Sequence, residues 1–209
     1  MRILVTLLWI LALLEASTAR AGGKERKLPL RWFVQTAPLV ILYHDDFGYT
    51  PGMGAQMAVG RCLRAGMDGV LKFTYCRPSQ NFSWLGETQS LKTDWYRWQF
   101  ALRLCWPSSH TSRFHLFAEM QGGWAYLHPH TLALDGGVQG PIFINANDEI
   151  KFAPALSGGF SYHLARRVAV YLQIEFGYFK QASRRLNEAA AAPAWKPLRQ
   201  LGAGVTLCL

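Results

Sequence analysis

Beyond its first fourteen residues, the chain has no uninterrupted apolar run of the length that a membrane-spanning helix needs, which is about 20 residues. Charged residues are also scarce, at 17% of the 209 residues, whereas 50% of the residues are hydrophobic. If such a chain enters a membrane, it has to do so as strands. A closed barrel is then the only suitable sheet, because every backbone N–H and C=O must find a partner away from water.

The amino-terminal residues have the pattern of a cleavable secretory signal. Arg2 supplies a positive charge, residues 3–14 form an apolar run, and Ala19 and Ala21 complete an Ala-x-Ala sequence. The apolar run is too short for a transmembrane helix. We therefore expect cleavage after residue 21, so that residues 1–21 are the signal peptide and residues 22–209 form one exported domain.

Motifs for nucleic-acid binding, cofactor binding and nucleophilic catalysis are missing as well. The formal net charge is +9, and removing residues 1–21 takes away two arginines and one glutamate and leaves +8. An exported protein meets little nucleic acid, so we expect its counter-charge to be anionic lipid or lipopolysaccharide. We expect no nucleic-acid partner, no cofactor and no metal.

Histidine and acidic residues gather in two expected loops and could form a metal or hydrolytic site. They are His44, Asp45 and Asp46 in one loop, and His128, His130, Asp135, Asp148 and Glu149 in another. A His-x-His pair supplies two ligands at most, and no nucleophile motif accompanies it. We therefore interpret these residues as solvated loop positions.

Alternation of apolar with polar or small residues, the period of a strand with two different faces, is clear in four segments. These are residues 95–106, 113–127, 167–179 and 200–209. Weaker alternation marks residues 54–64, 68–76 and 151–164. A further strand is expected within residues 33–43, where Pro38 suits a strand start or an irregular edge and the facing stays open.

The connections between these eight segments are short and long in strict alternation. The short ones are residues 64–68, 107–112 and 164–166, and the long ones are residues 44–53, 77–94, 128–149 and 180–196. Outer-membrane barrels have tight turns at one end and longer loops at the other. The sequence therefore predicts an all-β fold, an eight-stranded antiparallel up-and-down transmembrane β-barrel.

This pattern resembles the small outer-membrane barrel superfamily that includes outer-membrane proteins A, X and W, over essentially all of residues 22–209. The resemblance implies a Gram-negative cell-envelope protein in the outer membrane, with both termini in the periplasm and the long loops outside. It also implies contact with membrane lipid and lipopolysaccharide, and insertion by the barrel-assembly machinery. The family commonly ends in an aromatic residue, whereas this chain ends in Leu209.

The polar faces of the strands predict a lumen filled by charged side chains. Its expected members are Lys72, Arg97, Arg103, Arg113, Glu119, Arg167 and Glu175. Eight strands leave an interior just wide enough for side chains to fill. Because a buried charge without a partner is costly, we expect Glu119 and Glu175 to accept hydrogen bonds from arginines and the barrel not to conduct. The alternative is a hydrated lumen with the charges separately solvated.

Aromatic residues near the strand ends suit the two membrane interfaces. Those assigned to this girdle are Trp95, Trp98, Trp106, Trp124, Tyr126, Tyr162 and Tyr178. Arg61 interrupts an apolar face near a strand end, where a long side chain can reach water. Three cysteines, Cys62, Cys105 and Cys208, are expected on the inner face near the periplasmic end, and we expect at most one disulfide among them.

The function that the sequence favours is that of a non-enzymatic, porin-like outer-membrane barrel whose external loops serve surface interaction or whose body serves envelope integrity. One alternative is a barrel enzyme that acts on lipid A or phospholipid. The other is a soluble lipocalin-like carrier, also eight-stranded, which would have apolar residues inside and polar residues outside. The charged inner faces predicted here argue against the carrier.

Overall fold

The structure, a computed structural model, describes residues 32–43, 49–84, 86–108, 112–134, 140, 142–144, 147–180 and 195–209. The expected signal peptide, residues 1–21, lies outside these residues. Among the described residues, no helix is both long and apolar enough to cross a membrane.

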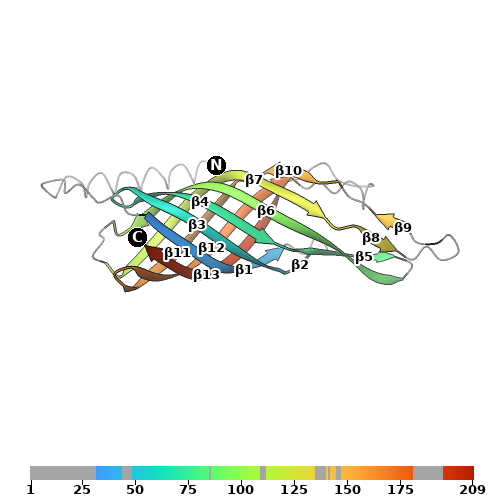
Figure 1. Cartoon of the computed structure of the whole chain (residues 1–209), viewed down its shortest axis with the longest axis horizontal. Helices are drawn as coiled ribbons and strands as arrows, with labels where there is room; N and C mark the ends of the chain where they lie inside the picture. The colour runs from blue at the N-terminus through green and yellow to red at the C-terminus, as the bar shows by residue number, and fades with distance from the viewer. Residues whose placement is uncertain are drawn as a thin grey trace, which may run out of the picture.

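Eight antiparallel walls form a closed barrel (Figure 1). The walls are β1 (Trp32–Tyr43), β3 (Gly52–Arg64), β4 (Met67–Cys76), β6 (Glu87–Trp106), β7 (Phe114–Pro129), β10 (Glu149–Phe152) continued by β11 (Ala155–Ala165), β12 (Val168–Lys180) and β13 (Trp195–Cys208). The first and last strands close the ring, with Val34 opposite Leu207. The predicted eight-stranded up-and-down barrel is confirmed.

Short connections gather at one end of the barrel and long ones at the other (Figure 1). Gly66 has a φ of 74° in the turn between β3 and β4, a conformation that glycine adopts without strain. The long connections add four short strands, β2 (Tyr49–Thr50), β5 (Ser79–Trp84), β8 (Leu132–Leu134) and β9 (Ile142–Ile144). Strand β6 extends beyond its pairing with β4, which ends at Trp95, and continues as a hairpin with β5.

The two faces of the wall differ in polarity as the alternation predicts. On β6, Arg97 and Gln99 are buried, whereas Trp98 and Phe100 are 45% and 66% exposed. The same alternation of buried and exposed side chains runs along β7 and β3. Polar residues therefore line the lumen and large apolar residues cover the exterior, which is the reverse of a lipocalin-like carrier.

Strand β1 takes the facing that its sequence left open. Phe33, Gln35 and Ile41 point into the lumen and are buried. Pro38 lies in the middle of this strand, so its expected place at a strand start or irregular edge is wrong. The ladder to β13 passes from Thr36 opposite Val205 to Leu39 opposite Gly202, and Pro38, which has no N–H to donate, falls in the interval between them.

Candidate functional site

The lumen is organised around Glu119, which points inward from β7 and is 3% exposed. Arg103 Nε on the neighbouring β6 donates to Glu119 Oε1 at 2.6 Å, and Lys72 Nζ on β4 donates to Oε2. Ser157 Oγ and Gln121 Nε2 donate to the same Oε2 at 2.7 and 3.0 Å. One carboxylate thus pairs with two buried cations and accepts four hydrogen bonds, which compensates for its removal from water.

A second buried ion pair lies nearer the loop end. Arg97 Nη1 donates to Glu175 Oε1 at 2.9 Å, and Arg97 Nη2 donates to Gln200 Oε1 at 2.8 Å. Arg97 extends from β6, Glu175 from β12 and Gln200 from β13, so this pair spans the lumen between non-adjacent walls. Side chains rather than backbone therefore link the opposite sides of the barrel here.

Neutral polar residues extend the network to β1 and β13. Arg103 Nη2 donates to Gln35 Oε1 at 2.6 Å, and Gln35 Nε2 donates to Thr206 Oγ1 at 2.8 Å. Sequence reasoning did not assign Gln35 to the lumen because the facing of the first strand was unknown. The strict alternation of the last strand did place Thr206 on the inner face.

Two of the seven expected lumen residues lie elsewhere. The structure brings together Lys72, Arg97, Arg103, Glu119 and Glu175, all buried in the lumen. Arg113 and Arg167 are exposed at the short-turn end, which corrects the assignment. The reason is local, since Arg113 precedes the first residue of β7 and Arg167 belongs to the turn between β11 and β12. The inward alternation does not hold past the end of the strand.

An apolar cluster closes the lumen at the loop end. We call it the outer plug; its members, each at most 9% exposed, are Ile41, Cys76, Trp95, Leu127 and Leu198. They come from five different walls and meet in the lumen. Trp95 is 3% exposed, so its assignment to the interfacial girdle is wrong. It shares the inward side of β6 with Arg97.

Toward the opposite end, aromatic residues from two separate apolar clusters are buried in the lumen; we call Phe33 of one cluster and Phe117 and Tyr171 of the other, together, the inner plug. The Arg103 guanidinium lies over the rings of Phe33 and Phe117, with its Cζ 5.2 and 4.8 Å from the ring centroids. Gly60 leaves room for the Phe33 ring, because a Cβ there would lie 2.0 Å from Phe33 Cζ. The cation and the plug therefore stabilise each other.

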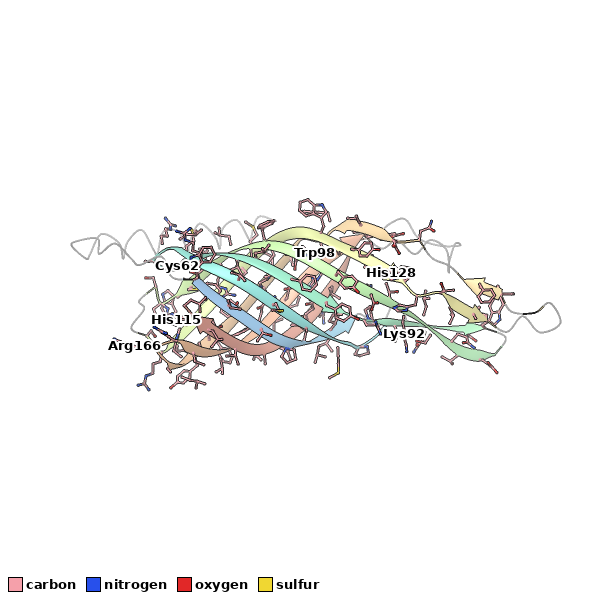
Figure 2. The ribbon with its side chains drawn as sticks, in the orientation of Figure 1. Cys62, Lys92, Trp98, His115, His128 and Arg166 are labelled. Carbon is pink, nitrogen blue, oxygen red and sulfur yellow. The ribbon has the colours of Figure 1, made fainter. Side chains whose placement is uncertain are left out.

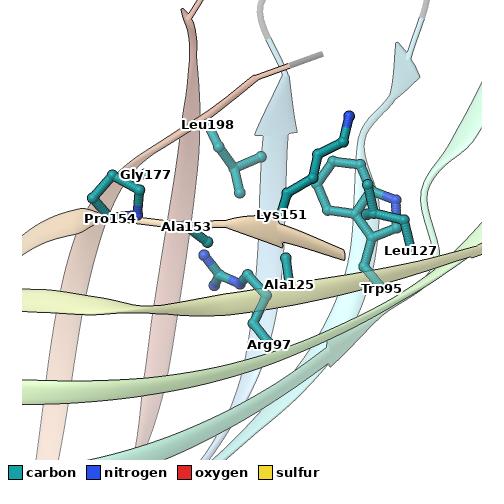
Figure 3. A pocket seen from close by; sticks show the side chains of 9 residues that line it. All are labelled: Trp95, Arg97, Ala125, Leu127, Lys151, Ala153, Pro154, Gly177 and Leu198. Atoms are coloured by element: carbon teal, nitrogen blue, oxygen red, sulfur yellow. The ribbon is translucent and has the colours of Figure 1, made fainter. Parts of the chain in front are cut away.

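Little space is left between the outer plug and the ionic network (Figure 3). The cavity there measures about 10 Å³, which is at the lower limit for one water molecule. The cavity is lined by Arg97, Lys151 and Gly177, together with Trp95 and Leu198. From one end to the other, the lumen consists of an apolar plug, a charged middle layer and an aromatic plug.

Outside the wall, at the loop end, Asp94 gathers several donors. Arg77 Nε lies 2.6 Å from Asp94 Oδ1, and Tyr75 Oη donates to the same oxygen at 2.9 Å. His130 Nε2 lies 2.9 Å from Oδ2. The hydrogen bonds from Arg77 are the largest cause that lowers the pKa of Asp94, to about 2. This carboxylate anchors the base of the β4–β6 connection.

A second carboxylate at this end, Asp148, accepts a hydrogen bond from Tyr126 and lies 2.7 Å from His128 Nδ1. The Tyr126 hydroxyl, followed by His128, lowers the pKa of Asp148. Two of the expected solvated histidines, His128 and His130, are therefore each paired with an aspartate. No metal-binding cluster of three or more suitable side chains occurs in the described part of the chain. His44, Asp45, Asp46 and Asp135 lie outside the described residues.

Four of the aromatic residues expected at the membrane interfaces are exposed on the outer face of the wall. Trp98, Trp106, Trp124 and Tyr162 are each between 40% and 63% exposed. The side chain of Tyr178 lies outside the described part. Arg61, near the end of β3, places its guanidinium 5.3 Å from the centroid of the Trp32 ring. A cation beside an exposed tryptophan is typical of the boundary between lipid and water.

The cysteines are present as thiols, so the structure contains no disulfide among Cys62, Cys105 and Cys208. Cys62 Sγ donates to the carbonyl oxygen of Arg64 at 3.3 Å, and Cys105 Sγ to Asp68 Oδ2 at 3.6 Å. Both contacts lie near the short-turn end, where all three cysteines were expected.

No protein-family model matches the chain, and no curated protein matches its sequence. Among solved structures, the barrel is similar to the outer-membrane protein OprG of Pseudomonas aeruginosa, with a TM-score of 0.54, 8% identity and coverage of 86% of this chain and 96% of that one. It is also similar to the Neisserial surface protein NspA, with a TM-score of 0.53, 12% identity and coverage of 85% and 96%. Ail of Yersinia pestis gives a TM-score of 0.51, 8% identity and coverage of 86% and 99%. The chain therefore has the closed eight-stranded barrel fold found in small bacterial outer-membrane proteins.

Proposed function

We propose that this chain is a bacterial outer-membrane protein whose barrel is a closed anchor and whose long connections serve surface interaction or envelope integrity. The main observation in support of this proposal is the filled lumen. The two plugs enclose a middle layer in which the charges of Glu119 and Glu175 are paired. A pore would need a continuous wet path, and the cavity beside Arg97 has room for one water at most.

The exterior supports insertion in a bilayer. Large apolar side chains are exposed around the barrel, among them Leu71, Phe100, Met120, Ile174 and Leu207. A soluble monomer rarely exposes a continuous apolar surface of this kind, because it would associate or aggregate in water. In a bilayer, the acyl chains of the lipids would contact this apolar surface. The closed ring of hydrogen-bonded strands leaves no unpaired strand edge within the barrel wall. Export by the expected signal peptide is part of this proposal.

A non-enzymatic role fits the rim at the loop end. Partners of the two rim carboxylates, Asp94 and Asp148, are an arginine, two tyrosines and two histidines. A hydrolytic site for lipid A or phospholipid needs a nucleophile within hydrogen-bond reach of its base. The contacts of these carboxylates supply none, and Arg77 holds Asp94 in a structural ion pair.

The connections at the loop end have strands of their own. The hairpin of β5 and β6 pairs from Ser79 opposite Lys92 to Trp84 opposite Glu87, and β8 pairs with β9. These strands project past the end of the wall (Figure 1). Such projections are where a closed barrel can present residues to a partner.

Cell fractionation combined with heat-modifiable gel mobility tests the membrane placement. We expect the protein in the outer-membrane fraction, with a folded band that shifts on boiling. Recovery in the soluble periplasmic fraction would refute the proposal.

Planar-bilayer recording tests the closed lumen. We expect no steady single-channel steps from the native protein. As a positive control, a variant that removes the middle layer and the outer plug together, E119A/E175A/W95A, should conduct if it folds. Resolved steps from the native protein would contradict the closed barrel and leave membrane placement intact.

A further inference from the structure

The short-turn end of the barrel has a cationic rim. We call this set the arginine rim: Arg61, Arg64, Arg113, Arg166 and Arg167. All of them are exposed except Arg61, which is half-buried against Trp32. The one acidic side chain that the structure describes near this end is Asp68, which accepts from the Cys105 thiol on the inner side of the wall. The charged side chains described on the exterior of this rim are therefore all positive.

The opposite end differs in its charge. There the described cations include Arg77, Lys92, Lys151 and Arg199, and they stand among the carboxylates Glu87, Asp94, Asp148 and Glu149. Arg77 is neutralised by Asp94, and His128 lies against Asp148. Among the described side chains, both signs of charge therefore mix at the loop end, whereas the exposed charges of the arginine rim are all positive.

Each of the three short connections contributes to the rim. Arg64 closes β3, Arg113 precedes β7, and Arg166 lies in the turn between β11 and β12. Because these turns join different pairs of neighbouring walls, the arginines are distributed around the barrel. Arg166 projects from this end beyond Cys62 and His115 (Figure 2). The charge therefore forms a belt and not a single pocket.

The belt adjoins the apolar exterior directly. Arg61 pairs across strands with Trp32, which is 48% exposed. Arg113 is followed by the exposed Phe114, which stacks on Phe160 with ring centroids 5.8 Å apart. Leu164, two residues before Arg166, is 62% exposed. Cations that begin where a lipid-facing surface ends lie at the level of the lipid headgroups.

From this arrangement we propose that the arginine rim binds the phosphate headgroups of anionic phospholipids in the leaflet that surrounds the short turns. The proposal rests on the membrane placement proposed above. Guanidinium groups suit phosphate because their planar donors can form paired, charge-assisted hydrogen bonds. The adjoining apolar side chains favour a lipid over a soluble anion, since they hold acyl chains below the same headgroup.

The test compares lipid retention by the full-length mature protein. The protein is folded into vesicles of phosphatidylcholine mixed with phosphatidylglycerol and then released in mild detergent, and the lipids that stay bound are identified by native mass spectrometry. The test variant is R166Q/R167Q, and the matched control is K92Q/R199Q, which removes two exposed positive charges from the walls and hairpin nearer the loop end. A heat-modifiable band shows that each variant is folded.

We expect the native protein and the K92Q/R199Q variant to retain phosphatidylglycerol in preference to phosphatidylcholine. In R166Q/R167Q this preference should fall by about fivefold for each arginine that binds a headgroup, because one arginine near an anionic membrane surface contributes about 1 kcal/mol. The preference of the native protein should also weaken at high salt, because the arginines are exposed to screening.

Three results would overturn the proposal. One is equal retention of both lipids by the native protein. The others are an unchanged preference in R166Q/R167Q and an equal loss of the preference in K92Q/R199Q. Folding of all variants into pure phosphatidylcholine vesicles would still support the membrane placement, so the two proposals can fail separately.

Discussion

Glu119 is the position at which the ionic layer can be tested most directly. The substitution Glu119→Gln keeps the size and one acceptor of the side chain but removes the negative charge that Lys72 and Arg103 share. Breaking a buried ion pair by removing one partner costs about 3–5 kcal/mol, because the other charge is left uncompensated. Since two cations lose their partner here, we expect the free energy of unfolding to fall by an amount in the upper part of that range.

Glu175→Gln provides the internal comparison. Glu175 pairs with Arg97 alone, and Arg97 keeps its hydrogen bond to Gln200 after the substitution. Glu175→Gln should therefore lower the free energy of unfolding by at most about 3 kcal/mol, which is the lower end of the range for a single broken pair. Glu87→Gln, at an exposed position of the β5–β6 hairpin, is the surface control and should change stability by no more than about 0.5 kcal/mol.

The assay is urea unfolding of the barrel from lipid vesicles, followed by tryptophan fluorescence and extrapolated linearly to water. The variants K72M and K72M/E119Q complete a double-mutant cycle with Glu119→Gln, and we expect the double variant to recover about 1–3 kcal/mol of the loss because one uncompensated cation is gone. A cost for Glu119→Gln of under about 1 kcal/mol, the range of solvent-exposed pairs, would refute the reasoning. It would favour the hydrated lumen in which each charge is separately solvated.

Three further predictions concern the rims and the thiols. Asp94 has a folded pKa of about 2, below its value of about 3.9 in an unfolded chain, so its stabilising contacts should be fully present above that value and lost as the pH falls toward 2. The stability difference between the native protein and D94N should accordingly shrink across this window, and a constant difference would contradict the assignment. Thiol titration in denaturant without reductant should find four thiols, and two would indicate a disulfide that the structure lacks. Trypsin added to intact cells should cut in the long connections, for instance after Arg184 or Arg185, and cleavage confined to Arg64 or Arg166 would show that the barrel is inverted.

The sequence alone was sufficient for the architecture because a strand has a period of two. Residues 95–106 alternate between apolar positions and polar or small ones, and this single pattern gives both the strand and the side that faces the lumen. The alternation of short and long connections then fixed the up-and-down order. These signals are local, so they could be recognised without knowledge of distant contacts.

Only the tertiary structure decided which lumen residues meet. Glu119 and Lys72 are 47 residues apart, and their contact depends on the stagger between the walls, which no single strand encodes. The plugs were missed for the same reason, because Ile41, Trp95 and Leu198 are ordinary apolar residues until closure brings their walls together. The facing of β1 likewise followed from its pairing on both sides, since both faces of this strand are largely apolar in the sequence. Strand period is a property of neighbouring residues, whereas the contents of a lumen depend on how all eight walls close.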